Sequence, residues 1–183
     1  MTGHISFIRG FLYKVCLALF VLIQTPGISA QQYHFENFTL ENGLPQANIY
    51  CIFQDSRGYL WLGTEGSGAC RFDGKTFMAF DREKGMAGDV VRSIIEDDLG
   101  QLWFGTDSGV SVYNGRKFLT INEKNGLSSN TVVCLYRDKT DTVWVGTAGD
   151  KGGLNKIEYL QDDSVKVRNF TVSDGLSGNN IFA

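Results

Sequence analysis

Short apolar runs alternate with clusters of glycine, asparagine and aspartate along most of this chain. The first such runs lie near residues 48–54, 59–64, 69–72 and 76–81. Runs of this length, bounded by turn-forming residues, predict short β-strands joined by tight turns. The 3.6-residue apolar period of an amphipathic helix does not occur in these runs. The pattern therefore predicts an all-β fold.

The group of four runs recurs along the chain at a near-constant interval. Trp61, Trp103 and Trp144 lie 42 and 41 residues apart, each in a string of the form apolar-Trp-apolar-Gly-Thr. The glycines of this string are Gly63, Gly105 and Gly146. Strings that end in aspartate precede it at residues 49–55, 91–97 and 132–138. The chain therefore contains an internal repeat, which constrains the fold more strongly than any local pattern.

Each copy of the repeat predicts one four-stranded antiparallel meander, whose apolar faces are covered only if like units pack face to face. A repeat of about 40 to 45 residues with four strands is typical of a β-propeller. We expect blade 1 at about 44–81, blade 2 at about 86–122, blade 3 at about 127–172 and the start of blade 4 at about 176–183. A closed ring needs roughly four to eight blades. We therefore interpret residues 31–183 as an incomplete propeller, whose remaining blades belong to a longer protein.

The first 30 residues differ from the rest. Arg9 and Lys14 precede the apolar run 15–23, and small residues up to Ala30 follow it. A membrane span needs roughly 20 apolar residues, whereas the core of a signal peptide needs about 7 to 15. We therefore predict a signal peptide at 1–30, with an uncleaved anchor as the alternative. The predicted location is the periplasm or the extracellular face of the inner membrane.

Charge and cysteine content narrow the classes of partner. Without the first 30 residues the chain has 15 basic and 20 acidic side chains, a net charge of −5. Nucleic-acid binding needs a concentrated basic face, so we expect no nucleic-acid partner. Cys51, Cys70 and Cys134 remain, and an odd number of cysteines does not form a disulfide framework. No cofactor is predicted.

The combined strings resemble a known repeat. The Asn-Gly-Leu or Asp-Gly-Leu turn, the strand that ends in aspartate and the Leu-Trp-apolar-Gly-Thr string are similar to the two-component regulator propeller repeat, over residues 37–183. The resemblance implies the exported sensor region of a bacterial sensor or hybrid histidine kinase, whose membrane helix and output domain lie downstream. It also implies a glycan fragment as ligand, and the full-length form could dimerise. Asp141 departs from the family pattern, which has a glycine at this turn.

Residues at matching repeat positions are best explained by structure. The tryptophans could stack on sugars, but their recurrence in every blade favours packing in the core. Asp55, Asp97 and Asp138 could bind a metal, yet aspartate before a tight turn normally accepts local backbone N–H groups. Neither the carboxylate pattern of a calcium loop nor the close ligand pairs of a zinc site occurs. No metal site is predicted.

A ligand site is expected where the loops that enter the first strands meet the loops that follow the second strands. The polar residues of these loops are Gln46, Asn48, Glu65, Asp89, Asp107, Asn130 and Asp150. Their amides and carboxylates could bind the hydroxyl groups of a glycan or another small ligand. Each of them could equally cap its own turn.

Three functions remain open at this stage. The favoured hypothesis is a ligand-sensing module that is not itself an enzyme. A glycan lyase or hydrolase fragment is the second, although hydrolysis usually needs two facing carboxylates about 5 to 10 Å apart and no catalytic residue can be assigned. The third is a scaffold that binds another protein through the rim of the propeller.

Overall fold

The computed structural model describes residues 14, 33, 35–159 and 164–182. The chain divides into two compact units, Met1–Asn37 and Phe38–Ala183. In the first unit, the ring centroids of Tyr33 and Phe35 lie 6.3 Å apart. The predicted signal peptide lies outside the described residues, except for Lys14.

Within the described ranges, no helix is both long enough and apolar enough to cross a membrane.

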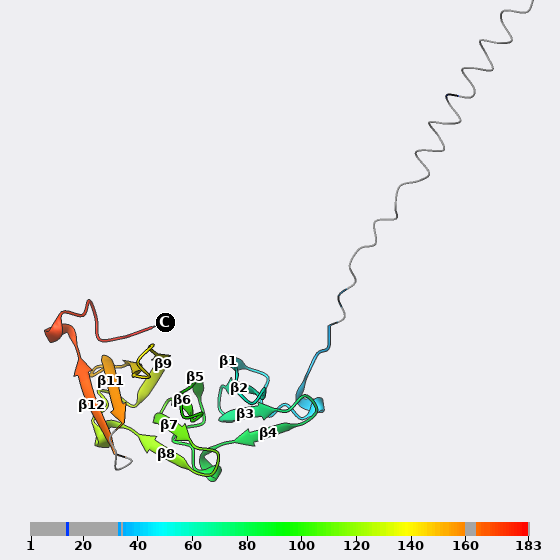
Figure 1. Ribbon diagram of the computed structural model, residues 1–183, viewed down its shortest axis with the longest axis horizontal. Coiled ribbons are helices and arrows are strands. Elements are labelled where there is room, and N and C mark those ends of the chain that lie inside the picture. The colour runs from blue at the N-terminus through cyan, green and yellow to red at the C-terminus, as the bar shows by residue number, and fades with distance from the viewer. Residues whose placement is uncertain (1–13, 15–32, 34, 160–163, 183) are drawn as a thin grey trace, which may run out of the picture. The chain divides into compact units, whose positions relative to one another are not determined.

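The second unit contains three four-stranded antiparallel sheets (Figure 1). The first consists of β1 (Ile49–Gln54), β2 (Leu60–Thr64), β3 (Ala69–Phe72) and β4 (Phe77–Phe80). The second consists of β5 (Val91–Glu96), β6 (Leu102–Thr106), β7 (Gly109–Tyr113) and β8 (Phe118–Ile121). The third consists of β9 (Thr131–Arg137), β10 (Val143–Ala148), β11 (Leu154–Tyr159) and β12 (Val165–Phe170). Consecutive strands are neighbours in every sheet, and the predicted all-β fold of four-stranded blades is confirmed.

A short 3-10 helix stands before the first strand of each sheet, and another follows the third sheet. These helices are η1 (Leu40–Asn42), η2 (Arg82–Lys84), η3 (Glu123–Asn125) and η4 (Val172–Asp174). In η2 the Asp81 carboxylate accepts the backbone N–H of Lys84 at 3.1 Å, and Gly85 ends the helix with φ of 101°. This left-handed conformation favours glycine, because a Cβ atom would clash. The turn that separates the repeats is therefore one helical turn closed by its glycine.

The first strand of each sheet contains an irregularity at the same repeat position. The pairing register shifts between Ile49 and Cys51 in β1 and between Val91 and Ser93 in β5. In β9 it shifts opposite Gly146 and Thr147. A β-bulge inserts one extra residue and changes the direction of its side chain. The extra residues are Tyr50, Arg92 and Val133.

Neighbouring sheets pack against each other. Strand β5 contacts both β1 and β9, and Figure 1 shows these first strands next to one another. In the core between the first two sheets, the ring of Trp61 lies 5.4 Å from that of Phe104 in the second sheet and 5.1 Å from that of Phe80 in its own sheet. Each buried aromatic side chain contributes about 1.5–3 kcal/mol through removal of apolar surface from water. The core therefore lies between successive sheets, as the repeat predicts.

Residues 176–182 form no strand but keep a contact that the first strands make. Ile181 donates its backbone N–H to the Thr147 carbonyl at 3.2 Å. It also lies against Gly146, as Val91 lies against Gly63. No described strand pairs with this segment, so its backbone has no ladder to join.

Candidate functional site

The repeat tryptophans bind the aspartate that precedes the β1–β2, β5–β6 or β9–β10 turn. The indole N–H groups of Trp61, Trp103 and Trp144 donate to Asp55, Asp97 and Asp138 at 2.8, 2.9 and 2.9 Å. Trp61 and Trp103 are buried, whereas Trp144 is half-buried because no described sheet covers its outer face. The three side chains are therefore held within their own sheets and not presented for stacking on a sugar.

The repeat glycines are points of close approach between sheets. A Cβ atom on Gly63 would lie 2.5 Å from Cys51 Sγ and 2.6 Å from the Val91 carbonyl oxygen. On Gly105 it would lie 2.8 Å from Val132 Cγ1 of the next sheet. On Gly146 it would lie 2.4 Å from Cys134 Sγ of the same sheet and 2.9 Å from Ile181 Cγ2. Contacts below 3 Å leave no room for a side chain. These glycines therefore allow neighbouring sheets to approach each other closely.

Three of the predicted ligand-binding residues form one hydrogen-bonded group in the first sheet. Asn48 Nδ2 donates to Glu65 Oε2 at 2.6 Å, and Gln46 Nε2 donates to the Glu65 carbonyl oxygen at 3.4 Å. Hydrogen bonds from Asn48 and Tyr50 lower the pKa of Glu65, and the bond to Glu65 raises the pKa of Tyr50. Asn48, Tyr50 and Glu65 are exposed. The group therefore presents a carboxylate, an amide and a phenol ring to solvent.

Arg92 lies beside this group on the neighbouring sheet. Its guanidinium carbon is 6.0 Å from the centre of the Tyr50 ring. Its Nη1 atom is buried and has no hydrogen-bond partner among the described residues. A buried donor without a partner costs about 1–3 kcal/mol. An incoming oxygen atom that accepts from this guanidinium would remove that cost.

Arg82 connects two more of the predicted residues. Its Nε lies 3.2 Å from Asp89 Oδ2, and its Nη2 lies 3.8 Å from Asp107 Oδ2. Arg82 Nη2 also donates to Ser108 Oγ at 2.7 Å. Ion pairs as exposed as these contribute at most about 1 kcal/mol each to stability. Their main effect is to orient both carboxylates toward one cation.

A hollow of about 320 Å³ lies between the loops of the first sheet and η2. Its lining consists of Pro45, Gly66, Ser67, Ala79, Asp81, Arg82, Glu83 and Asp89. Small-molecule sites usually occupy about 300–1,000 Å³. The hollow is therefore large enough for about one sugar-sized group, and Glu65 immediately precedes Gly66 in its wall.

Asn130 and Asp150 lie apart from these contacts. Asn130 Oδ1 accepts the Glu123 backbone N–H at 2.9 Å, and Glu123 Oε1 accepts the Asn130 backbone N–H at 3.1 Å. Asn130 therefore closes its own turn. In the same way, Asp89 Oδ1 accepts the backbone N–H of Arg82 at 3.0 Å. Asp150 is exposed, and within the described ranges its side chain makes no hydrogen bond or ion pair.

Three residues that lie close to the predicted ligand-binding residues were not themselves predicted from the sequence: Tyr50, Arg82 and Arg92. Tyr50 and Arg92 share the bulge position, which Val133 occupies in the third sheet. A change of residue type at an otherwise regular repeat position was the signal that could have identified them.

Cys70 is buried, and Cys51 and Cys134 are half-buried. Cys51, Cys70 and Cys134 are free, and burial raises the pKa of the Cys51 and Cys70 thiols to about 11. Both are therefore protonated at neutral pH, and a thiol is a poor ligand and nucleophile. In the part of the chain that the structure describes, no group of three or more His, Cys, Asp or Glu side chains is placed to hold a metal ion.

Comparison with known proteins identifies the repeat. The family described as two component regulator propeller matches residues 43–66, 85–108 and 126–149. Each match runs from the turn glycine through the first two strands of a sheet. No curated protein sequence matches the chain.

The solved structures that share its fold include two extracellular domains from one bacterium. The extracellular domain of BT3049 from B. thetaiotaomicron, described as a hybrid two component system, has a TM-score of 0.69 and 20% identity, covering 81% of this chain and 22% of that one. The extracellular domain of BT4673 from B. thetaiotaomicron, described as a one component system, has a TM-score of 0.61 and 23% identity, covering 76% of this chain and 21% of that one. The chain thus spans about a fifth of either structure. The chain therefore carries three copies of the two component regulator propeller repeat, one in each of the three described sheets.

Proposed function

We propose that this chain is the exported, ligand-sensing part of a two-component signalling receptor, and that its ligand is a glycan fragment or a similar polyhydroxylated molecule. The observation that carries the proposal is the polar group of Asn48, Tyr50 and Glu65, with the unpaired Arg92 nitrogen beside it. The three matches to the two component regulator propeller repeat support the signalling role.

The chemistry of this group suits a sugar. Glu65 accepts hydrogen bonds, Asn48 and Arg92 donate them, and the exposed Tyr50 ring offers an apolar face. Sites that combine a few convergent polar groups with an aromatic side chain orient small ligands in this manner. The hollow of about 320 Å³ near Glu65 gives room for further hydroxyl groups.

Ligand occupancy could be relayed through the packing of the blades. Asn48 and Glu65 belong to the first sheet and its loops, whereas Arg92 belongs to the second sheet. A ligand that contacts both sheets binds more tightly to the arrangement of the two sheets in which both contacts form. This difference in affinity between the two arrangements is what can shift the equilibrium between them. The output domain lies downstream in the longer receptor, and no catalytic step is part of the proposal.

A binding screen with matched variants tests this function. The full chain is titrated with neutral and acidic oligosaccharides, and binding is measured by calorimetry and by the shift in Tm. We expect Glu65→Gln to weaken binding about tenfold or more, because loss of the charge weakens hydrogen bonds that a charged acceptor makes strong.

Glu41→Gln is the control, since it removes one exposed carboxylate of η1 that makes no described side-chain contact and was not predicted to bind ligand. It should leave the affinity unchanged. Equal affinity in wild type and Glu65→Gln would contradict the proposal, and so would the absence of binding to every oligosaccharide. Turnover of an oligosaccharide would instead favour the lyase or hydrolase hypothesis.

A further inference from the structure

A second candidate site lies in the groove between the first and second sheets, at the strand ends opposite the ligand-binding loops. A pocket of about 50 Å³ opens there, beside the β1–β2 turn and the β7–β8 turn. Its lining consists of Asp55, Arg57, Tyr59, Trp61, Arg71, Glu96, Gly100, Leu102, Tyr113 and Gly115. Because the loops that carry Asn48 and Glu65 lie at the other ends of the same strands, this pocket is separate from the proposed sensing site.

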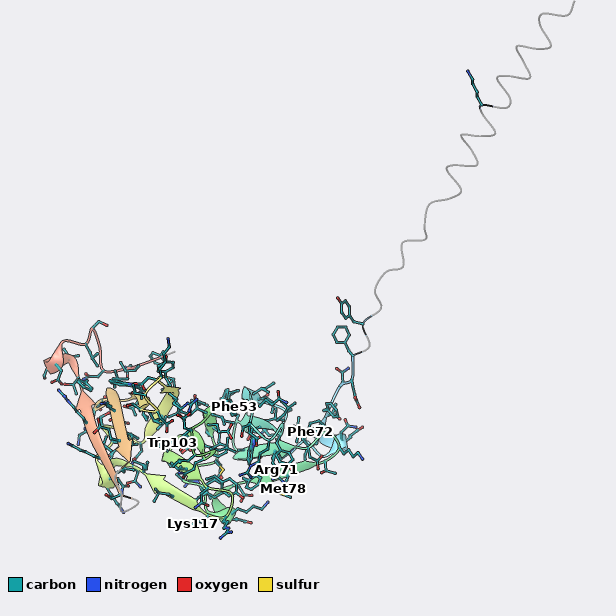
Figure 2. All side chains as sticks on the ribbon, in the orientation of Figure 1. Phe53, Arg71, Phe72, Met78, Trp103 and Lys117 are labelled. Atoms are coloured by element: carbon teal, nitrogen blue, oxygen red, sulfur yellow. The ribbon has the colours of Figure 1, made fainter. Side chains whose placement is uncertain are left out.

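Two arginines of this pocket lack an acidic partner. Arg71 lies with its guanidinium carbon 4.5 Å from the centre of the Tyr59 ring, and its Nη2 lies 3.7 Å from the Met78 sulfur, a weak acceptor. Figure 2 shows Arg71 next to Met78. Arg57 reaches across to the second sheet, where its Nη1 lies close to Gly115. Within the described residues, neither guanidinium forms an ion pair.

The two carboxylates in the lining are already bound by other donors. Asp55 Oδ2 accepts from Trp61 Nε1 at 2.8 Å, and Asp55 Oδ1 accepts the backbone N–H groups of Arg57 and Tyr59 at 3.0 and 2.9 Å. The two oxygens of Glu96 accept from the hydroxyl and backbone N–H of Ser56 at 2.7 and 2.8 Å. The carboxylate oxygens of Asp55 and Glu96 therefore already accept hydrogen bonds, whereas the two guanidinium groups form no ion pair among the described residues.

The equivalent groove between the second and third sheets has a different character. Leu99 and Val112 stand at the repeat positions of Arg57 and Arg71. That groove, of about 270 Å³, is lined by Leu99 together with the acidic Asp141 and Glu158. The repeat therefore folds without either arginine, and the paired guanidinium groups belong to the first groove alone among the described sheets.

We propose that the first groove binds a small oxyanion group, a carboxylate, sulfate or phosphate, between Arg57 and Arg71. Guanidinium groups donate two parallel hydrogen bonds to such groups and stack on aromatic rings, as Arg71 stacks on Tyr59. A site for one water needs roughly 10–15 Å³, so about 50 Å³ holds a group of about three to five heavy atoms and no complete sugar ring. The pocket thus takes the anionic head of a ligand, with the remainder outside.

The test is a titration of the full chain with sodium sulfate, sodium phosphate, sodium glucuronate and neutral glucose at one ionic strength held with sodium chloride. Binding is measured by calorimetry in wild type, Arg57→Leu and Arg71→Val. Both replacements are the residues that the next repeat carries at these positions, so both should fold, which circular dichroism checks. We expect each to weaken oxyanion binding about tenfold or more, in keeping with the loss of a charged hydrogen bond.

Arg168→Val is the control, because it removes one exposed positive charge from β12 in the third sheet. Its affinity for the oxyanions should equal that of wild type. Preference for glucuronate would assign the site to a sugar acid, and preference for sulfate or phosphate to the free ion. Loss of binding in Arg168→Val equal to that in Arg57→Leu, or oxyanion binding no tighter than that of glucose, would overturn the proposal. Glu65→Gln should not affect this titration, so failure here is distinguishable from failure of the sensing site.

Discussion

Replacement of Asp97 by asparagine tests how much the tryptophan–aspartate bond contributes to a blade. Asp97 is buried and accepts three hydrogen bonds: from Trp103 Nε1 at 2.9 Å and from the backbone N–H groups of Leu99 and Gln101 at 3.0 and 2.8 Å. Asparagine has nearly the same shape but only one acceptor oxygen. If that oxygen keeps both turn bonds, the new amide faces the indole N–H of Trp103, and two donors oppose each other in the core.

The expected loss follows from burial. Trp103 is 0% exposed, so water cannot replace the lost acceptor. An unsatisfied buried donor costs about 1–3 kcal/mol, and the loss of a charged acceptor places Asp97→Asn at about 2 kcal/mol. For a chain of this size, that corresponds to a fall in Tm of about 4–8 °C.

Asp138→Asn is the matched control for this prediction. Asp138 makes the same bond to Trp144 at 2.9 Å, but Trp144 is half-buried, so water can reach the indole. The free energy of unfolding, measured by urea denaturation and followed by circular dichroism, should fall less in Asp138→Asn than in Asp97→Asn. Trp103→Phe removes the donor, so combining it with Asp97→Asn should cost less than the sum of the two single changes. Equal losses in the two aspartate variants, or additive losses in the double variant, would refute the argument from burial.

Three further predictions concern the packing and the turns. Gly63→Ala should lower the free energy of unfolding in urea by about 1–3 kcal/mol, because its Cβ atom would lie 2.6 Å from the Val91 carbonyl oxygen. Gly178→Ala is the control, since open space surrounds its Cβ position and stability should change little. Equal effects of the two replacements would contradict the steric argument. Asn155→Ala should lower the free energy of unfolding by about 2–4 kcal/mol, since the buried Asn155 amide accepts the Ser128 backbone N–H at 2.8 Å and donates to the Val145 carbonyl oxygen at 3.0 Å. An unchanged midpoint of the urea denaturation would show that water fills the site. Backbone hydrogen bonds from Thr76 and Lys75 lower the pKa of Asp73 to about 2. The stabilising effect of the Asp73 carboxylate should therefore be complete above about pH 4 and lost as the pH falls toward 2. The difference in Tm between wild type and Asp73→Asn should shrink over that range, and a constant difference would show that the pKa is not lowered.

The sequence alone predicted an all-β fold of repeated four-stranded units, and the three antiparallel sheets confirm it. Tryptophan and glycine recur at fixed offsets because each blade must meet the next with the same geometry, so the repeat spacing reports the packing directly. The turn glycines could be recognised as well, since a left-handed residue such as Gly85 is almost always glycine. That these turns are short 3-10 helices could not be distinguished from other glycine turns by pattern.

The polar sites depended on the tertiary structure. Arg92 stands in an ordinary strand pattern, and only the bulge and the neighbouring sheet bring it to Tyr50 and the group around Glu65. Asp89 and Asp107 were predicted only as members of a larger set of ligand-binding residues, and the structure shows that both contact Arg82, through contacts that join residues on different loops.

The same holds for the groove that contains Arg57 and Arg71. The two arginines lie 14 positions apart, and nothing in that interval predicts a shared pocket. Repeat spacing determines which residues face the next blade, because that contact is the same in every copy. The charged residues that line a groove stand at positions where the copies of the repeat differ. These residues acquire their partners only when the sheets pack against each other.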